Sequence, residues 1–124
     1  MEKTANKRTT GSEFEELALA FLLTLGYRLV KRNFHFGRVG EIDLVMLDGD
    51  VYVFVEVKGR RSHTYGLPEE AVTRAKQTTM KKVAQGFFHV NKTEWPVGRF
   101  DVVAVDFATG RDGGAEIRHY PNAF

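Results

Sequence analysis

The sequence of 124 residues contains no cysteine and only three prolines. Without cysteine the chain has no disulfide framework, no thiolate nucleophile and no zinc site built from cysteine. Its four histidines stand far apart, at positions 35, 63, 89 and 119, and show no His-x-x-x-His spacing. Thiol chemistry and a helical pair of histidine metal ligands are therefore excluded.

Long apolar runs and a large excess of one charge are also absent. No apolar run approaches the ~18 residues that a membrane span requires. Residues 1–11 are polar, with three basic side chains and no apolar stretch before Phe14. We therefore expect no membrane segment, no secretory signal and a cytoplasmic protein. Eighteen basic against sixteen acidic residues leave a formal charge of +2, so composition alone does not indicate a nucleic-acid binder.

The chain is long and apolar enough to build one hydrophobic core, because 43% of its residues are hydrophobic. No internal repeat, low-complexity segment or linker divides it. We expect residues 1–11 to form a flexible basic N-terminal tail. Residues 12–124 are expected to form a single domain.

Hydrophobic periodicity predicts the order of the elements. Apolar residues at helical spacing predict a helix from Ser12, the N-cap of a capping box with Glu15, to a C-terminal cap at Gly26. Strands are predicted at 27–36, 41–47, 51–58 and 100–107, with a further edge strand at 115–120. A second helix is predicted from Pro68 to about Phe88. Its expected inward residues are Val72, Ala75, Met80, Val83, Ala84 and Phe87.

This order, α-β-β-β-α-β, contains a strand, a long helix and another strand in succession. Such a crossover is right-handed and places the last long strand parallel to an earlier one. The predicted fold class is α/β, with three layers and a mixed central sheet. Which strands are neighbours is left open.

Three charged residues on two predicted strands are candidates for an active site. Glu56 and Lys58 are two apart on one strand, so their side chains share a face and lie ~6.5–7 Å apart. Asp43 is six residues before Gly49 and Glu56 is seven after it, so a hairpin at 48–50 makes the carboxylates direct or diagonal neighbours. On one face they would form an oxygen-rich pocket suited to Mg²⁺, with Lys58 beside it.

Two interpretations of this trio remain open. Two carboxylates can hold a divalent ion on a scissile phosphate, while a lysine orients the attacking water and offsets developing charge. Alternatively, Glu-x-Lys marks only a solvated strand end with a weak ion pair. Glu56 interrupts an otherwise apolar strand, where an unpaired carboxylate costs several kcal/mol unless a metal or cation compensates it.

The order of short motifs carries a family resemblance over about residues 11–106. The motifs are Gly11, Glu15 and Ala18, then LGY at 25–27, Asn33, GEID at 40–43, VFVEVK at 53–58, Gly66, Pro68, EAV at 70–72, Lys76 and RFDVV at 99–103. Together they resemble the restriction-endonuclease-like PD-(D/E)XK nuclease superfamily, with its αβββαβ core. More narrowly, the chain looks like the YraN family of bacterial proteins, which are similar to archaeal Holliday-junction resolvases.

The resemblance implies a metal-dependent endonuclease with Mg²⁺ or Mn²⁺ as cofactor. By position, Asp43, Glu56 and the peptide carbonyl of Val57 match the metal ligands, and Lys58 matches the motif lysine. Glu15 matches a first-helix glutamate that lines the site. Two positions depart from the pattern: Ile42 replaces the proline of the superfamily name, and Phe14 replaces a glycine common in the family.

Two glutamates have structural interpretations besides the functional one. As N3 of the predicted capping box, Glu15 would bond back to the Ser12 backbone, a role that need not exclude one in the site. Glu41 is expected to be a surface partner of a nearby arginine, with its side chain directed away from Asp43.

Basic residues gather around the candidate site, as contact with a phosphate backbone requires. They are Arg28, Lys31, Arg32, His35 and Arg38 before it, Arg60, Arg61 and His63 after it, and Arg74, Lys76, Lys81, Lys82 and Lys92 on or after the second helix. A solvated helix face remains the alternative for the last group. We single out Arg38, Arg60, Arg61 and Lys76 as expected nucleic-acid contacts.

Two function classes remain at this point. One is an endonuclease that recognises branched or flapped DNA by shape and backbone contacts. The other is a non-catalytic nucleic-acid-binding module on the same fold. A homodimer is an open alternative to a monomer, with the predicted strand at 115–120 as a candidate edge.

Overall fold

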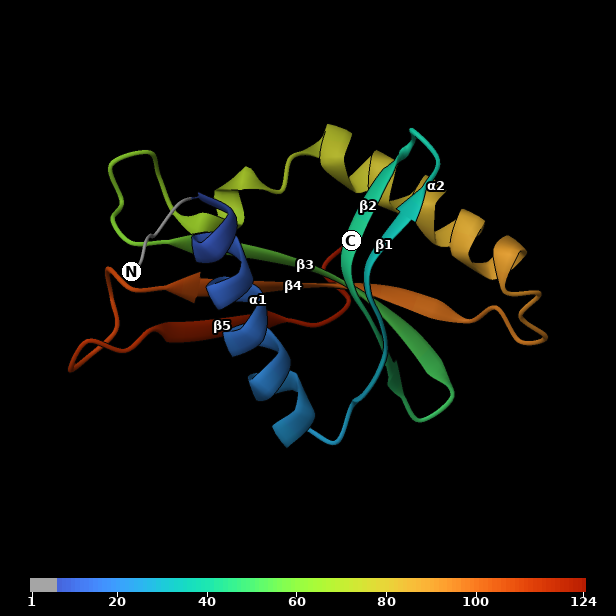
Figure 1. Cartoon of the computed structure of the whole chain (residues 1–124), viewed down its shortest axis with the longest axis horizontal. Coiled ribbons are helices and arrows are strands. Elements are labelled where there is room, and N and C mark those ends of the chain that lie inside the picture. The colour runs from blue at the N-terminus through green and yellow to red at the C-terminus, as the bar shows by residue number, and fades with distance from the viewer. Residues whose placement is uncertain (1–6) are drawn as a thin grey trace.

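The computed structural model describes residues 7–124, and side chains from Ser12 onward. Its elements are α1 (Lys7–Thr24), β1 (Arg28–Phe36), β2 (Gly40–Asp48), β3 (Val51–Arg60), the 3₁₀ helix η1 (Pro68–Ala71), α2 (Arg74–Val90), β4 (Gly98–Asp106) and β5 (Glu116–Tyr120). Figure 1 shows this arrangement. The predicted α-β-β-β-α-β order and the additional edge strand are confirmed.

One five-stranded sheet organises the molecule, in the order β1-β2-β3-β4-β5. Strands β3 and β4 are parallel, whereas the other three neighbouring pairs are antiparallel. The mixed sheet expected from the crossover is therefore present. Its parallel pair is the one joined through α2.

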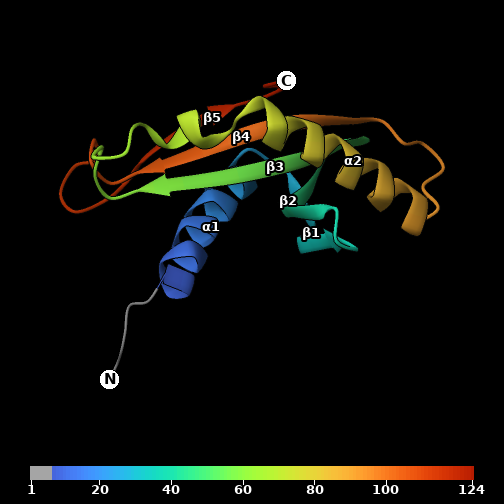
Figure 2. The ribbon, with the colours of Figure 1, turned by 90° about the horizontal axis from the view of Figure 1, so that it is seen from above.

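The two helices lie on opposite faces of the sheet, so the fold has three layers (Figure 2). Alternating residues of β3 supply both cores, because successive side chains of a strand point to opposite faces. Val53 and Val55 pack in a buried cluster with Leu22 of α1. Phe54 packs in a second cluster with Phe87 of α2. Glu56 follows Phe54 by two residues and therefore belongs to the α2 face.

The first helix begins earlier than its capping signal predicts. It starts at Lys7, so Ser12 lies inside the helix and the predicted N-cap is wrong. Serine and glutamate three residues apart are also tolerated within a helix, and the pattern alone does not end one. Of the predicted tail 1–11, residues 1–6 lie outside the described part, and residues 7–11 are helical.

The second predicted helix is divided into η1 and α2. Thr73 caps α2, and its hydroxyl oxygen accepts a hydrogen bond from the backbone N–H of Lys76 at 3.2 Å. This cap gives the helix a new start after the 3₁₀ turn. Ala75 is exposed in the first turn, contrary to the prediction, and Val72 precedes the helix and is only partly buried. The other four expected inward residues are buried: Met80, Val83, Ala84 and Phe87.

Within residues 7–124, no helix combines the length and the apolar composition that crossing a membrane requires.

Candidate active site

Strands β2 and β3 separate in the middle of the sheet. Their pairing ends at Leu44 and Val55, although both strands continue beyond that pair. From there β2 pairs only with β1, and β3 only with β4. In Figure 1, β2 turns away from β3. If the pairing of Leu44 with Val55 continued by one residue, it would place Asp43 opposite Glu56. Both carboxylates therefore lie where β2 and β3 separate.

Asp43 is held by the opposite strand through its side chain. Its Oδ2 accepts a hydrogen bond from the backbone N–H of Val57 at 2.8 Å. Burial, and then the nearby charge of Glu56, raise the pKa of Asp43 to about 8, although the Val57 bond acts in the opposite direction. Asp43 therefore retains its proton at neutral pH unless a cation compensates its charge.

Glu56 is buried, with 2% of its surface exposed. Its Oε2 lies 3.3 Å from Nζ of Lys58 and 3.5 Å from Nζ of Lys76. Its Oε1 is also buried but has no hydrogen-bond partner among the described residues. Buried carboxylate oxygens are normally satisfied, so this one is available to a ligand.

The two lysines come from different elements. Lys58 lies two residues after Glu56 on β3, as the strand alternation predicts. Lys76 comes from the first turn of α2, where the Thr73 cap fixes the start of the helix. Predicted as a nucleic-acid contact, Lys76 is thus also a cation partner of Glu56.

Glu15 approaches the same region from α1. Burial is the main cause that raises its pKa, opposed by the positive charge of Arg32 and by a hydrogen bond from Asn33. Its negative charge also contributes to the raised pKa of Asp43. The helix thus brings Glu15 near the carboxylate pair, independently of the capping box that the structure lacks.

Glu41 is the acidic residue whose position the sequence interpretation misplaced. Residues two apart on a strand share a face, so Glu41 lies on the side of Asp43 and its charge helps to raise the pKa of Asp43. Among residues 12–124, the side chain within ion-pair distance of Glu41 is His35, with 3.6 Å between Nε2 and Oε1, and not an arginine. The alternation of side chains along a strand already places Glu41 and Asp43 on one face, so the sequence contained the information needed to correct this interpretation. We refer to Glu15, Glu41, Asp43 and Glu56, with Lys58 and Lys76, as the carboxylate cluster.

The oxygen donors fit a hard divalent cation that retains several other ligands. Glu56 offers an unpartnered oxygen opposite Asp43. The Val57 N–H points to Asp43, and the carbonyl of a strand residue points to the same side as its N–H. Within residues 12–124, no three His, Asp or Glu side chains form a complete metal-binding group. Two carboxylates with a carbonyl, completed by water and phosphate, are typical of Mg²⁺.

Arg60 and Arg61, which the sequence predicts as phosphate contacts, each have a partner within the chain. Arg61 pairs with Glu13 of α1, and its guanidinium carbon lies 4.5 Å from the ring centre of Phe107. Arg60 donates a hydrogen bond to the carbonyl of Gly59 at 3.1 Å. Arg38, by contrast, is exposed in the turn between β1 and β2.

Phe14, which replaces a glycine common in the family, is accommodated by a glycine of β3. A Cβ atom on Gly59 would lie 2.2 Å from the ring of Phe14. The absence of a side chain at Gly59 therefore lets α1 approach the end of β3 with a large aromatic residue in place.

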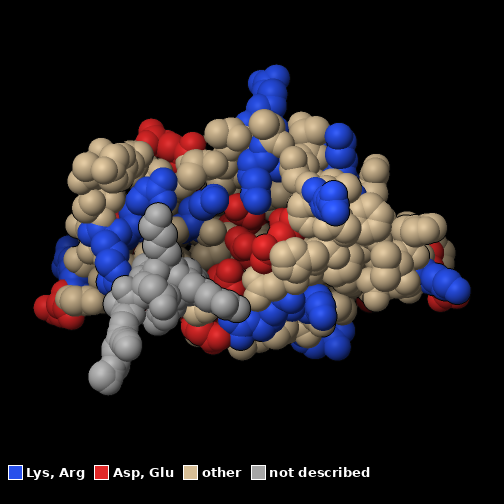
Figure 3. Space-filling view, turned by 45° about the horizontal axis from the view of Figure 1, so that its top comes forward, with Lys and Arg blue, Asp and Glu red and all other residues tan. Residues whose placement is uncertain are grey.

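On this face of the molecule, acidic side chains lie at the centre and basic side chains lie around them. Figure 3 shows acidic side chains in a hollow, with lysine and arginine side chains on several sides of it. A negative centre of this kind attracts a cation, and a surrounding positive rim attracts a polyanion.

Comparison with known proteins places these observations in a family. The model of a family described as "Uncharacterised protein family UPF0102" matches residues 14–105. The chain is 47% identical over 117 residues to a UPF0102 protein of Symbiobacterium thermophilum, covering 94% of this chain and 97% of the relative. A UPF0102 protein of Caldicellulosiruptor saccharolyticus is 41% identical over 119 residues, covering 96% and 99% of the two chains. The family match includes the entire carboxylate cluster.

Proposed function

Since this chain belongs to the UPF0102 family and carries the carboxylate cluster in its matched region, we propose that it is a metal-dependent endonuclease that hydrolyses phosphodiester bonds of nucleic acid. The observation that carries the proposal is the buried, unpartnered Oε1 of Glu56 opposite Asp43, where β2 and β3 separate. The resemblance to PD-(D/E)XK nucleases supports the same assignment. Branched or flapped DNA is the proposed substrate class.

In this proposal, Asp43, Glu56 and the carbonyl of Val57 hold Mg²⁺ or Mn²⁺. When bound, the ion supplies positive charge to the scissile phosphate and lowers the pKa of water. Asp43 gives up its retained proton before it acts as an anionic ligand. The fold contributes the opened gap that keeps both carboxylates near the surface but out of bulk water.

The lysines have two tasks in this proposal. Lys58 orients the attacking water by a hydrogen bond from Nζ and offsets charge that develops on the phosphate. Lys76 partly neutralises Glu56 and is within reach of a bound phosphate group. Arg38, exposed on the β1–β2 turn, contacts the backbone farther from the scissile bond. None of these contacts reads a base, in keeping with recognition by shape.

Cleavage assays test the proposal directly. Labelled four-way junction, flap, single-stranded and linear duplex DNA, and RNA, would be incubated with the protein in Mg²⁺, Mn²⁺ or EDTA. Asp43→Asn, Glu56→Gln and Lys58→Ala should each abolish metal-dependent cleavage. Asp112→Asn, which neutralises an exposed carboxylate in the β4–β5 turn, is the matched control and should cleave as the wild type does. Equal activity in all proteins would indicate a contaminant or a misplaced site.

A non-catalytic nucleic-acid-binding module is the second candidate. It is favoured by one observation: Lys58 and Lys76 both lie within ion-pair distance of Glu56 and compensate its charge. Mn²⁺ titration separates the candidates. For the endonuclease, Glu56→Ala weakens Mn²⁺ binding and leaves DNA affinity unchanged or improved. For the module, the wild type binds nucleic acid without measurable Mn²⁺ affinity and without cleavage.

A further inference from the structure

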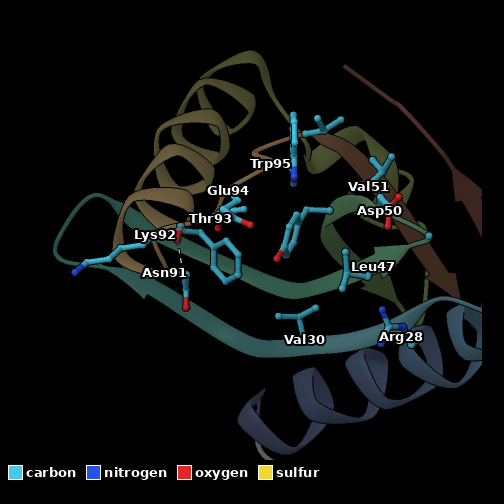
Figure 4. Close-up of a pocket in the computed structure, with 14 residues that line it drawn as sticks. Arg28, Val30, Leu47, Asp50, Val51, Asn91, Lys92, Thr93, Glu94 and Trp95 are labelled. Atoms are coloured by element: carbon cyan, nitrogen blue, oxygen red, sulfur yellow. Dashed lines mark hydrogen bonds between the residues drawn. The ribbon is translucent and has the colours of Figure 1, made fainter.

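A second concave surface lies at the other end of β3. A cavity of about 1090 Å³ opens between the C-terminal end of α2, the β2–β3 turn and the start of β1 (Figure 4). Its apolar lining includes Val30, Leu47, Tyr52 and Phe87, and Trp95 stands at its side. We call this surface the Trp95 groove. Tyr52 is four residues before Glu56 on β3, which corresponds to ~13 Å, so the groove is separate from the carboxylate cluster.

The Trp95 groove carries large apolar side chains that are exposed to solvent. Trp95 is 77% exposed, and Val97, which also lines the groove, is 53% exposed. Val30 of β1, which lines the groove too, is 39% exposed. Contiguous exposed apolar groups of this kind mark binding surfaces, whereas single ones are ordinary.

Four exposed charged residues also line the groove. Two are basic, Arg28 and Lys92, and two are acidic, Asp50 and Glu94. Within residues 12–124 none of the four has an ion-pair partner. By contrast, Asp48, next to the same turn, pairs with Arg99 at 2.9 Å. An apolar centre with a charged rim is the anatomy of a protein interface.

The equal numbers of basic and acidic residues around the Trp95 groove indicate which class of partner fits it. A nucleic-acid strand would be repelled by the two carboxylates as much as it is attracted by the two cations. A protein surface that carries both signs can satisfy all four groups. A two-fold symmetric dimer meets this requirement without a further partner, because each copy presents to the other the signs it needs.

The free sheet edges are less suited to self-association. The β1 edge carries Lys31 and Arg32, and basic side chains on an edge strand oppose the addition of a further strand. At the β5 edge, Arg118 and His119 are already engaged with carboxylates of this chain. The groove therefore fits a second copy better than the predicted edge at 115–120 does.

We propose that two copies of this chain associate face to face across the Trp95 groove, burying Trp95 and Val97 of both copies and pairing the charged rim residues across the two-fold axis. This dimer does not depend on the proposed nuclease activity. It leaves the carboxylate cluster outside the interface. The interface is held by apolar burial at its centre and by opposite charges at its rim.

The single tryptophan of the chain is a built-in reporter, because Trp95 is the only source of tryptophan fluorescence. Sedimentation velocity and tryptophan emission would be recorded on the full chain from micromolar to near-millimolar concentration. A dimer should form with a midpoint that coincides with a blue shift of the emission and with protection from acrylamide quenching. A monomer throughout, with Trp95 quenchable at every concentration, would overturn the proposal.

Charge-reversal variants test whether the change in sedimentation and tryptophan emission with concentration comes from charge pairing between two copies at the Trp95 groove. Arg28→Glu/Lys92→Glu makes the rim wholly acidic, and Asp50→Lys/Glu94→Lys makes it wholly basic. Each variant alone should dimerise at least about tenfold more weakly, and the mixture of the two should form heterodimers. Recovery on mixing also shows that both variants fold. Lys81→Glu/Lys82→Glu, on exposed residues of α2 outside the groove, is the control of equal charge change and should dimerise like the wild type. Two variants that stay monomeric when mixed would contradict the charge pairing.

Discussion

The carboxylate of Asp43 accepts the backbone N–H of Val57 at 2.8 Å, just beyond Leu44 and Val55, the last main-chain pair between their strands. A side chain thus satisfies a main-chain donor that the separating β2 backbone no longer reaches. The same contact draws Asp43 into a partly buried position beside Glu56. The raised pKa of Asp43 is therefore a consequence of how the sheet opens.

We first predict that Asp43→Asn stabilises the metal-free protein at neutral pH. The folded-state pKa of Asp43 is raised from its ordinary value to about 8, so the folded state loses stability as pH rises from the unfolded pKa toward the folded one. An asparagine can still accept the Val57 bond but carries no charge. In EDTA, we expect urea denaturation at pH 7 to show a gain of up to about 4 kcal/mol, because pH 7 lies about three units above the ordinary pKa of 3.8 and each unit corresponds to about 1.4 kcal/mol.

The pH series is the control for this prediction. Near pH 4, close to the ordinary pKa of 3.8, Asp43 is largely protonated in the unfolded state as well as in the folded state, so the difference between Asp43→Asn and the wild type should nearly disappear. A gain of equal size at both pH values would contradict an electrostatic cause.

Second, removal of the ammonium of Lys76 should destabilise the fold through Glu56. Lys76→Met keeps the aliphatic stem but leaves the buried carboxylate with Lys58 as its remaining ion-pair partner among the described residues. We expect a loss of about 1–3 kcal/mol in the free energy of unfolding. Lys82→Met, on the exposed face of the same helix, should change it by less than about 0.5 kcal/mol. If both variants lose the same amount, the contact with Glu56 is not the cause.

Third, the fold should lose stability in acid through a partly buried network around Arg118. Hydrogen bonds from Arg118 and Tyr120 lower the pKa of Glu69 to about 2. Burial alone would raise the pKa of Asp106, but bonds from Arg118 and His63 lower it to about 2. Carboxyls with lowered pKa values stabilise the folded state above their unfolded pKa values, and this stability is lost as pH falls toward the folded ones.

This acid effect can be measured as the slope of stability against pH. Urea denaturation of the wild type between about pH 5 and pH 2 should show a steady loss. In Arg118→Met the protein should be less stable at pH 6, and the slope should be shallower because both carboxyls lose their main donor. An unchanged slope would contradict the assigned role of Arg118.

Fourth, Gly59→Ala should disturb the contact between α1 and β3. The new Cβ atom would lie 2.2 Å from the ring of Phe14, so either the helix or the ring must move. We expect a loss of about 1–3 kcal/mol, as for other overpacked sites. Adding Phe14→Ala should make the alanine at 59 nearly harmless, and a double-mutant cycle by thermal or urea unfolding measures this coupling. Additive losses would argue against the steric cause.

Local sequence patterns determined most of the secondary structure. The alternation from Val51 to Lys58 predicts a strand with two faces, and the structure buries Val53 and Val55 against α1 and Phe54 against α2. The symmetric spacing about Gly49 predicts that Asp43 and Glu56 are neighbours, because the register of a tight hairpin follows from its turn. These inferences succeed since strand periodicity and hairpin register depend on residues close in the chain.

Local sequence patterns did not predict features that depend on contacts between elements distant in the chain. A capping box predicts a helix start at Ser12, yet α1 begins at Lys7. Arg61 follows the motif lysine in sequence, and only the folded chain shows that Glu13 and Phe107 contact it, while its phosphate contact stays a prediction.

The sequence by itself determined the two faces of β3, the crossover, and Asp43, Glu56 and Lys58 as charged residues of the candidate site. Only the tertiary structure decided that β2 and β3 separate at Asp43, that Lys76 joins Glu56 and that the Trp95 groove assembles from α2, β1 and the β2–β3 turn. The physical reason is the range of the interactions. Periodicity acts over a few residues, whereas burial, ion pairing and the end of a strand pairing depend on segments that meet only when the chain is folded.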